Sequence, residues 1–421
     1  MTTDSPQTQK NSVSMVRPGG CSPFAWLRTL PLFRWLDDHF DNVIVVIIAL
    51  VTALAGLIAF LETWAGNHYA TDIAQSQALA MDALGHDMSS RQRENYDFYL
   101  YTTWNEWDWR RSRAEGSDEM LATRSSHVAA IISPLTPLLD ENKPYFNPET
   151  QYADFYTYHV DTNLITTTVL LEQRAFAIET ANIWNGKADG YVTILTLLAV
   201  SLFLYGLSTT IKGDTRYLFA VVGTFLVSLS LLWSLILTLI PVPTIPSEAI
   251  TEYARGVGLS YLGDYEQASE AFNIALQAYP RYGNAYNERG KAHLRSQKYA
   301  EAVKDFQQAI ENGHEDQSTY WEMGWAYYLL GDYPSSVEAG RRALELDPNL
   351  LPIVMNIGTA LLAKGETQAA MRQVEQGLSM AADPNSPVPA SWNHNYLRLT
   401  VQDLDRLIAA LDGRTGFDEV P

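Results

Sequence analysis

The chain has 421 residues, of which 47% are hydrophobic and 18% are charged, and it carries a formal net charge of −19. This length exceeds one ordinary domain, so two or three folded units are expected. The acidic balance argues against a nucleic-acid partner. The single cysteine, Cys21, excludes an intrachain disulfide and a cysteine-based metal site.

Residues 1–42 form a predicted N-terminal tail. Its first twenty residues are polar and contain no apolar core, so no cleavable signal peptide is expected. From Phe24 to Phe40, bulky apolar residues alternate with arginines, which favours a short juxtamembrane helix lying along a membrane surface. Pro31 is expected to interrupt that helix.

Three uncharged segments, residues 43–61, 190–211 and 217–241, predict helices that cross a membrane. The first, VIVVIIALVTALAGLIAFL, has nineteen residues, and a helix of that length covers about 30 Å of hydrocarbon. Only the loop KGDTR separates the second segment from the third, so these two are expected to form a tight hairpin. None of the segments contains Asp, Glu, Lys, Arg or His, which argues against a transporter.

Basic residues near these segments indicate the orientation. Arg28 and Arg34 precede the first segment, and Lys212 and Arg216 lie in the hairpin loop, so both places are assigned to the cytoplasm. We therefore expect an integral protein of a bacterial cell membrane with a cytoplasmic N-terminus. Residues 62–189 and the region after residue 241 would then lie outside the cytoplasm.

The first segment carries small residues at helical spacing, which allow another helix to approach closely. These residues are Ala49, Thr52, Ala53, Ala55, Gly56 and Ala59. We favour packing of this face against the second or third segment of the same chain. The alternative is homo-oligomerisation through the first segment.

Residues 62–189 predict a helical stalk domain in which one long helix leaves the membrane and another returns. If the two are antiparallel and rise equally, residues 96–109 lie opposite residues 142–155. Both stretches are rich in aromatics, so we expect a structural aromatic cluster, completed by Leu121–Leu139. Its members would be Tyr96, Tyr99, Trp104, Trp107, Tyr145, Phe146, Tyr152 and Phe155. The alternatives are an aromatic belt at the membrane surface, which needs a turn at Gly85, and a ligand site.

A repeat of 34 residues begins after the third segment. It is marked by Gly256, Gly290, Gly324 and Gly358, by Tyr265, Tyr299 and Tyr333, and by Ala275, Ala309 and Ala343. With the runs GDYEQASEAFNIAL, QKYAEAVKDFQQAI and GDYPSSVEAGRRAL, these residues resemble the tetratricopeptide repeat. The resemblance implies four repeats, Ala249–Tyr282, Gly283–Asp316, Gln317–Leu350 and Leu351–Pro384.

The fourth repeat departs from the pattern, with Thr367 in place of tyrosine and Gly377 in place of alanine, which we expect to weaken its packing. Residues 385–412 are expected to form a capping helix, because a stack of repeats needs a polar end. Residues 413–421 follow as a tail.

The resemblance also implies a concave surface built from the first helix of each repeat. Its residues would be Tyr253, Val257, Tyr261, Asn287, Lys291, Arg295, Trp321, Trp325, Tyr328, Met355 and Thr359. Such a surface suits a peptide segment with a bulky apolar anchor and an acidic group near Lys291 and Arg295. Alternatively, Trp321 and Tyr328 only pack on neighbouring helices. The clamp that some family members use for a C-terminal carboxylate is not matched, since Glu288 and Glu322 occupy two of its places.

The sequence shows no motif for catalysis, so no enzyme, catalytic residue or cofactor is expected. His68 with Asp72, and Asp82 with His86, have a spacing that could share a metal ion. Because no further ligands are evident, we interpret both as ordinary pairs on a helix surface.

These observations predict an all-α membrane protein with three spans, a stalk and a C-terminal α-solenoid. The first hypothesis is a non-enzymatic scaffold or adaptor that binds a protein segment in its groove and assembles partners at the membrane. The second is a membrane sensor or mechanical adaptor whose stalk carries the recognition. A transporter or channel accessory subunit comes third.

Overall fold

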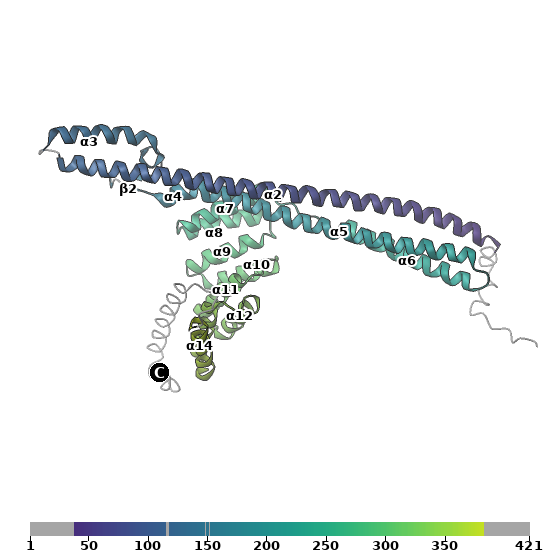
Figure 1. The fold of residues 1–421 in the computed structure, drawn as a ribbon. Helices are drawn as coiled ribbons and strands as arrows, with labels where there is room; N and C mark the ends of the chain where they lie inside the picture. Colours follow the sequence, from purple (N-terminus) through teal and green to yellow (C-terminus); the bar gives the residue numbers. More distant parts are fainter. Residues whose placement is uncertain (1–37, 115–117, 148, 151, 383–421) are drawn as a thin grey trace, which may run out of the picture. The chain divides into compact units, whose positions relative to one another are not determined.

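The fold is taken from a computed structural model that describes residues 38–114, 118–147, 149–150 and 152–382. Cys21, most of the predicted juxtamembrane helix, the predicted capping helix 385–412 and the tail 413–421 lie outside these residues. The described chain is almost entirely helical, as expected (Figure 1). It divides into two compact units, formed by described residues of Met1–Ile73 with Glu179–Pro243, and of Ala74–Ile178 with Thr244–Pro421.

The first unit contains the beginning of α2 (Phe40–Ala114), the end of α5 (Ile165–Thr210) and α6 (Thr215–Leu239). Buried residues recur every seven positions on each helix, as in a coiled coil. They are Ile44, Val51, Ile58 and Ala65 on α2, Tyr191, Leu198 and Tyr205 on α5, and Gly223, Ser230 and Leu237 on α6. The three helices therefore pack along one continuous seam, and the predicted helical hairpin α5–α6 is confirmed.

The outer side of this bundle is apolar. Large hydrophobic side chains such as Leu50, Phe203 and Phe225 are each 65% exposed, whereas small polar side chains, including Ser201 and Ser230, are buried. By length and composition, α2, the helix Phe155–Thr210 and α6 could each cross a membrane.

The small residues of the predicted first span do not face the other two helices. Ala49, Thr52, Ala53 and Gly56 are exposed, and only Ala55 and Ala59 are half-buried. The favoured prediction, that this face packs within the chain, is therefore wrong for four of the six residues. The reason is the seam of Ile44, Val51 and Ile58, which lies on the opposite side of α2.

The stalk part of the second unit begins with the remainder of α2, which continues unbroken through Gly85, so the turn needed for an aromatic belt is absent. The following elements are α3 (Glu119–Ile132), η2 (Ser133–Leu135), η3 (Pro137–Leu139), β1 (Phe146–Asn147), β2 (Tyr152–Ala153), α4 (Phe155–His159) and the π-helical segment η4 (Val160–Leu164). The strands pair antiparallel, with Phe146 opposite Ala153. Contacts of Asp87 with Asn163 and of Trp104 with Phe146 agree with the predicted antiparallel alignment.

An aromatic cluster forms where predicted, with a partly different membership. Tyr101 and Tyr158 are buried in it, and Trp104, Trp107, Tyr145, Phe146 and Phe155 pack around them with Leu100, Ile132, Leu138 and Leu139. Tyr96, Tyr99 and Tyr152 are instead 56%, 65% and 62% exposed, which corrects their assignment. The buried positions Asp97, Tyr101 and Asp108 follow the helical period, so Tyr96 and Tyr99 lie on the other side of α2.

The start of α5, up to Ile178, and four helix pairs complete the described part of the second unit (Figure 1). They are α7 (Ser247–Tyr261) with α8 (Tyr265–Ala278), α9 (Gly283–Arg295) with α10 (Tyr299–Glu311), α11 (Gln317–Leu330) with α12 (Tyr333–Leu346), and α13 (Leu351–Lys364) with α14 (Thr367–Ala382). Each pair coincides with one predicted repeat. A Cβ atom at Gly256 would lie only 2.5 Å from the Phe272 ring, so the close approach of α7 to α8 requires glycine there.

The fourth repeat is not loosened by Gly377. A Cβ atom at this position would lie 2.3 Å from Met355 Sδ, and Met355 is 1% exposed. The larger Met355 side chain thus fills the space that an alanine would occupy, which corrects the expectation of weaker packing at this position.

Candidate functional site

The first helices of the repeats contact one another in succession, α7 with α9, α9 with α11 and α11 with α13. This is the arrangement that the resemblance implied for the predicted concave surface. Seven of the eleven predicted residues are at least partly accessible to solvent, namely Val257, Tyr261, Lys291, Arg295, Trp321, Trp325 and Tyr328. We call these seven, together with Glu288 and Glu322, the first-helix face.

The other four predicted residues are buried, which corrects their assignment to the surface. Tyr253 packs on Phe272 and Tyr282. The Asn287 side-chain oxygen accepts a hydrogen bond from Thr319 Oγ1 at 3.0 Å. Met355 and Thr359 are 1% and 3% exposed, because α13 is covered along most of its length by α12 and α14.

The first repeat packs against the stalk. A Cβ atom at Gly258 of α7 would lie 2.8 Å from Val160 of η4, and the Phe176 ring of α5 packs edge-on against Tyr282. The Glu172 carboxylate accepts hydrogen bonds from Tyr282 Oη at 2.8 Å and from Asn284 Nδ2 at 2.9 Å. We call these contacts the stalk dock. They fix the repeats against the returning helix of the stalk.

The cations of the first-helix face are paired within the chain. Lys291 Nζ donates to Glu288 Oε1 at 2.9 Å, and Arg295 Nη2 lies 3.7 Å from Glu322 Oε1. The expectation that Lys291 and Arg295 await an acidic ligand therefore needs revision. Each cation already has a carboxylate beside it.

Burial shifts the titration of two carboxyl groups on or beside this face. It raises the pKa of Glu322 above its ordinary value, and Arg295 and Lys291 offset this only in part, while the neighbouring charge of Glu288 adds to the rise. Burial likewise raises the pKa of Glu172, against the hydrogen bonds from Tyr282 and Asn284. The neighbouring donors and cations thus stabilise the ionised forms of Glu172 and Glu322 less than burial destabilises them.

The aromatic part of the face lies on α11. Trp325 stacks on Tyr328, with ring centroids 5.1 Å apart. Trp321 and Tyr328 also pack partly against the core formed by α12 and α13, as their structural alternative predicted. Trp325 is half-buried, which leaves part of its ring accessible.

A polar network inside the repeats was missed by sequence reasoning. Asp305 of α10 is held by Arg289 of α9 at 2.5 Å and lies 2.9 Å from His293 Nδ1. Ser269 Oγ of α8 lies 3.0 Å from His293 Nε2. The contacts run from serine to histidine to aspartate, as in the catalytic triad of serine hydrolases. However, Ser269 is buried between helices and Arg289 forks onto the carboxylate, so we interpret the network as a tie joining three successive helices.

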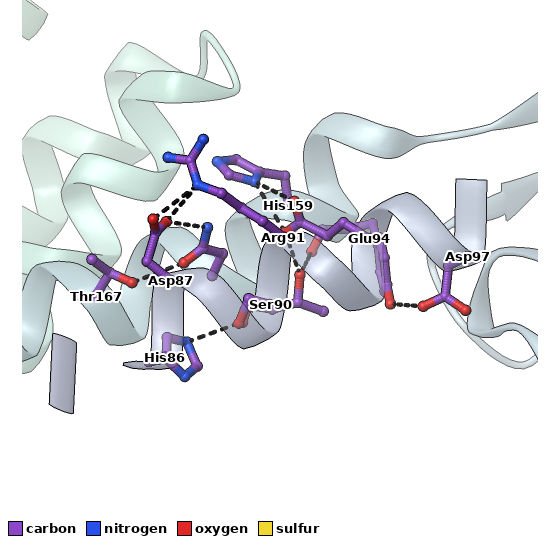
Figure 2. A network of polar contacts seen from close by, with 11 residues as sticks. His86, Asp87, Ser90, Arg91, Glu94, Asp97, His159 and Thr167 are labelled. Atoms are coloured by element: carbon purple, nitrogen blue, oxygen red, sulfur yellow. Dashed lines mark hydrogen bonds and ion pairs between the residues drawn. The ribbon is translucent and has the colours of Figure 1, made fainter. Parts of the chain in front are cut away.

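A second polar network connects α2 with the returning helix (Figure 2). Ser90 Oγ donates to the Thr162 carbonyl oxygen at 3.0 Å, and Asn163 Nδ2 donates to Asp87 Oδ1 at 3.0 Å. A π-helical turn such as η4 lacks the usual α-helical pairing of its carbonyls, and such turns are frequent at functional sites. Because η4 also contacts α7, it links the stalk network to the repeats.

The two histidine pairs considered for a metal ion have other contacts. His68 stacks on Trp184, with ring centroids 4.5 Å apart, and His86 Nε2 lies 3.4 Å from Ser90 Oγ. Within the ranges that the structure describes, no three His, Cys, Asp or Glu residues gather as metal ligands would.

Comparison with known families identifies the repeats. Residues 253–316 and 289–350 match the family model described as "Tetratricopeptide repeat". The C-terminal region therefore consists of tetratricopeptide repeats, and the resemblance drawn from the glycine, tyrosine and alanine spacing is confirmed.

The similarity to curated relatives covers about a third of the chain. Hsp70-Hsp90 organizing protein 2 of Arabidopsis thaliana is 27% identical over 146 residues, which cover 35% of this chain and 25% of that protein. Hsp70-Hsp90 organizing protein of Triticum aestivum is 28% identical over 141 residues, covering 33% of this chain and 24% of the relative. The chain thus spans about a quarter of the length of these relatives.

Solved structures similar to the chain include MamA from Desulfovibrio magneticus RS-1, with 22% identity and a TM-score of 0.32, covering 33% of this chain and 78% of that one. YrrB, described as a TPR protein with an unusual peptide-binding site, has 21% identity and a TM-score of 0.30. The similarity covers 40% of this chain and 89% of YrrB.

Proposed function

We propose that this chain is a membrane-anchored scaffold or adaptor whose repeats bind a segment of a partner protein and assemble it at the membrane. The observation that carries the proposal is the accessible part of the first-helix face, where Lys291, Arg295 and Trp325 lie on adjacent helices. The stalk dock contacts the first repeat and leaves this part uncovered. A bound segment would therefore be held by repeats that cannot swing independently of the stalk.

Membrane anchoring is supported by the inside-out character of the first unit. Within the predicted spans, the large exposed side chains are apolar, and the buried polar side chains are the hydroxyls of Ser201, Ser208 and Ser230, as expected of helices solvated by lipid. Trp64 and Trp184 lie just beyond the ends of the predicted spans and contact each other, with ring centroids 4.9 Å apart. Trp side chains favour the membrane–water interface.

The proposed orientation has a cytoplasmic N-terminus and places the stalk and the repeats outside the cytoplasm of a bacterial cell. The stalk dock supports one compartment for both, because its residues contact one another. Labelling Cys21 in intact cells with a membrane-impermeant thiol reagent tests the orientation. We expect no labelling until the membrane is permeabilised, and labelling of intact cells would reverse the assignment.

The scaffold function is tested by photo-crosslinking in cells. A photoreactive residue replaces Arg295 or Trp325 on the first-helix face, or Glu270 on the exposed side of α8 as a matched control. We expect a discrete crosslinked partner from positions 295 and 325 and none from position 270. Equal crosslinking from all three positions would contradict a binding role for this face.

The second candidate, a sensor or mechanical adaptor, is favoured by η4 and its polar network, which lie between α2 and the repeats. Deleting residues 249–421 separates the two functions, because only a sensor that reads through its stalk should keep its activity. The deletion also uncovers Phe176, so the full chain with Trp325→Ala serves as the comparison. This substitution is expected to weaken binding at the first-helix face and to leave the stalk dock intact. Retained activity in both variants would favour the sensor.

Two further roles receive less support. A transporter or channel accessory subunit would be expected to carry ionisable groups along its spans, whereas the buried polar groups within the predicted spans are serines such as Ser201 and Ser230. Homo-oligomerisation through the exposed small residues of α2 stays a prediction.

A further inference from the structure

The first-helix face and the stalk dock beside it carry more negative than positive groups. Glu172, Glu288 and Glu322 are three carboxylates, against the two cations Lys291 and Arg295. The three carboxylates interact electrostatically, because the charge of Glu288 raises the pKa of both Glu172 and Glu322. Lys291 is engaged by Glu288, so it cannot neutralise all three.

Of the three carboxylates, Glu322 has the weakest contacts with hydrogen-bond donors and cations. Its side chain is 18% exposed, and the nearest nitrogen of its ion-pair partner Arg295 lies 3.7 Å away, beyond hydrogen-bond distance. By contrast, Glu172 accepts bonds from Tyr282 and Asn284, and Glu288 accepts one from Lys291. A largely buried carboxylate without close donors favours the approach of a further cation.

The side chains next to Glu322 suit the stem of a basic residue. Trp325 follows one helical turn later, so it lies on the same side of α11. Its partly accessible ring, stacked on Tyr328, offers an apolar surface and a π face. Lysine and arginine side chains combine both needs, because their methylene stems pack on aromatic rings while their charged ends reach a carboxylate.

We infer that the first-helix face binds a protein segment that presents a lysine or arginine to Glu322 and an adjacent apolar side chain to Trp325. This inference rests on the proposed scaffold function and reverses the charge that the sequence suggested for the ligand. An acidic segment would meet Glu288 and Glu322 at the places where it needs donors. The repeats would thus select basic segments of partner proteins.

The test uses the full chain in lipid nanodiscs, panned against a display library of random linear peptides. We expect enrichment of Lys or Arg beside aromatic or aliphatic residues. Synthetic peptides from the selection should lose about tenfold in affinity with Glu322→Gln or Trp325→Ala. They should keep their affinity with Glu270→Gln, which removes a charge from the exposed side of α8. Their affinity should also fall as the ionic strength rises.

The outcomes separate the inference from the function on which it rests. Peptides whose binding needs Trp325, but which are acidic, unbiased in charge or indifferent to Glu322→Gln, overturn the inference and leave the scaffold function standing. A selection without any peptide whose binding depends on Trp325 would overturn both. Glu322→Gln should not lower the melting temperature, because it removes an under-compensated charge, so lost binding cannot be attributed to unfolding.

Discussion

The helical bundle of the first unit and the repeats of the second are built from the same kind of element with opposite patterns. In the bundle, Leu50 and Phe203 are exposed while Ser201 and Ser230 are buried. In the repeats, Phe272 and Phe306 are fully buried and the charged side chains lie mostly outside. In both units, glycines let neighbouring helices approach closely, as Gly223 does in the bundle and Gly256 in the repeats. This difference is the one expected if lipid surrounds the bundle, as proposed above, and water surrounds the repeats.

The largest effect is expected where the repeats break their own pattern by burying a charge. In Asp305→Asn, the Arg289 fork loses its partner, and the free energy of unfolding should fall by about 3 kcal/mol. Hydrogen bonds from His293 and Arg289 outweigh burial and lower the pKa of Asp305. Its contribution is therefore present above the ordinary aspartate pKa and is lost as the pH falls through the lowered value. Pulse proteolysis in urea measures the change.

The control is an exposed ion pair of the same region. Glu338 lies 3.7 Å from Arg342, and both side chains are more than half exposed. Glu338→Gln should change the unfolding free energy by less than about 0.5 kcal/mol. Equal effects of the two substitutions would mean that the Asp305 network does not join the helices.

Leu50→Asp tests whether the two units have different solvents. If α2 is surrounded by lipid at this position, a carboxylate there should cost about 2.5–3.5 kcal/mol of insertion free energy. The measurement is the fraction of the chain that stays in membranes after alkaline extraction. Leu330→Asp, at an exposed leucine of α11, should change stability by no more than about 0.5 kcal/mol. A Leu50→Asp variant that inserts normally would remove the contrast between the units.

Ser90→Ala tests whether the hydrogen bond between α2 and η4 stabilises the stalk part of the second unit. Loss of the hydrogen bond to the Thr162 carbonyl leaves a carbonyl of η4 without this donor, and local stability should fall by about 1 kcal/mol. Amide hydrogen exchange over residues 158–167 should accelerate. Ser89→Ala removes an exposed hydroxyl that bonds only within its own helix, to the His86 carbonyl, and should leave the exchange unchanged. Identical exchange in both variants would show that η4 does not depend on Ser90.

The sequence predicted those features that depend on local periodicity. The 34-residue spacing indicated four repeats, and each of them corresponds to one helix pair. Equal helical rise predicted that the two stalk helices align as the contact of Asp87 with Asn163 shows. The spacing of small residues on the first segment pointed to the wrong side of α2, because local sequence does not determine which side of a helix faces its neighbours. That choice depends on the positions of Tyr191 and Leu198, more than 120 residues away in sequence.

The site was predicted less well, because its decisive contacts are long-range. Glu172 and Tyr282 are separated by 110 residues, and no local pattern indicates that they meet. Glu288 and Glu322 were visible as departures from the carboxylate clamp. Lys291 and Glu288 pair locally on α9, but the pairing of Arg295 with Glu322 follows from how α9 packs on α11. Met355 and Thr359 occupy family surface positions but are buried, since the α13 of this chain is apolar on nearly every side.

The smallest effect is expected at the stalk dock, where the repeats meet the stalk. Because burial raises the pKa of Glu172, the folded state disfavours its ionisation, and stability should fall as the pH rises from the ordinary glutamate pKa through the raised value. Glu172→Gln keeps an oxygen for Tyr282 or Asn284 and cannot ionise. The melting temperature of this variant relative to the unsubstituted chain should therefore increase from acidic to neutral pH. A difference that stays constant, or runs the other way, would show that the Glu172 carboxylate is as well compensated in the dock as it is in water.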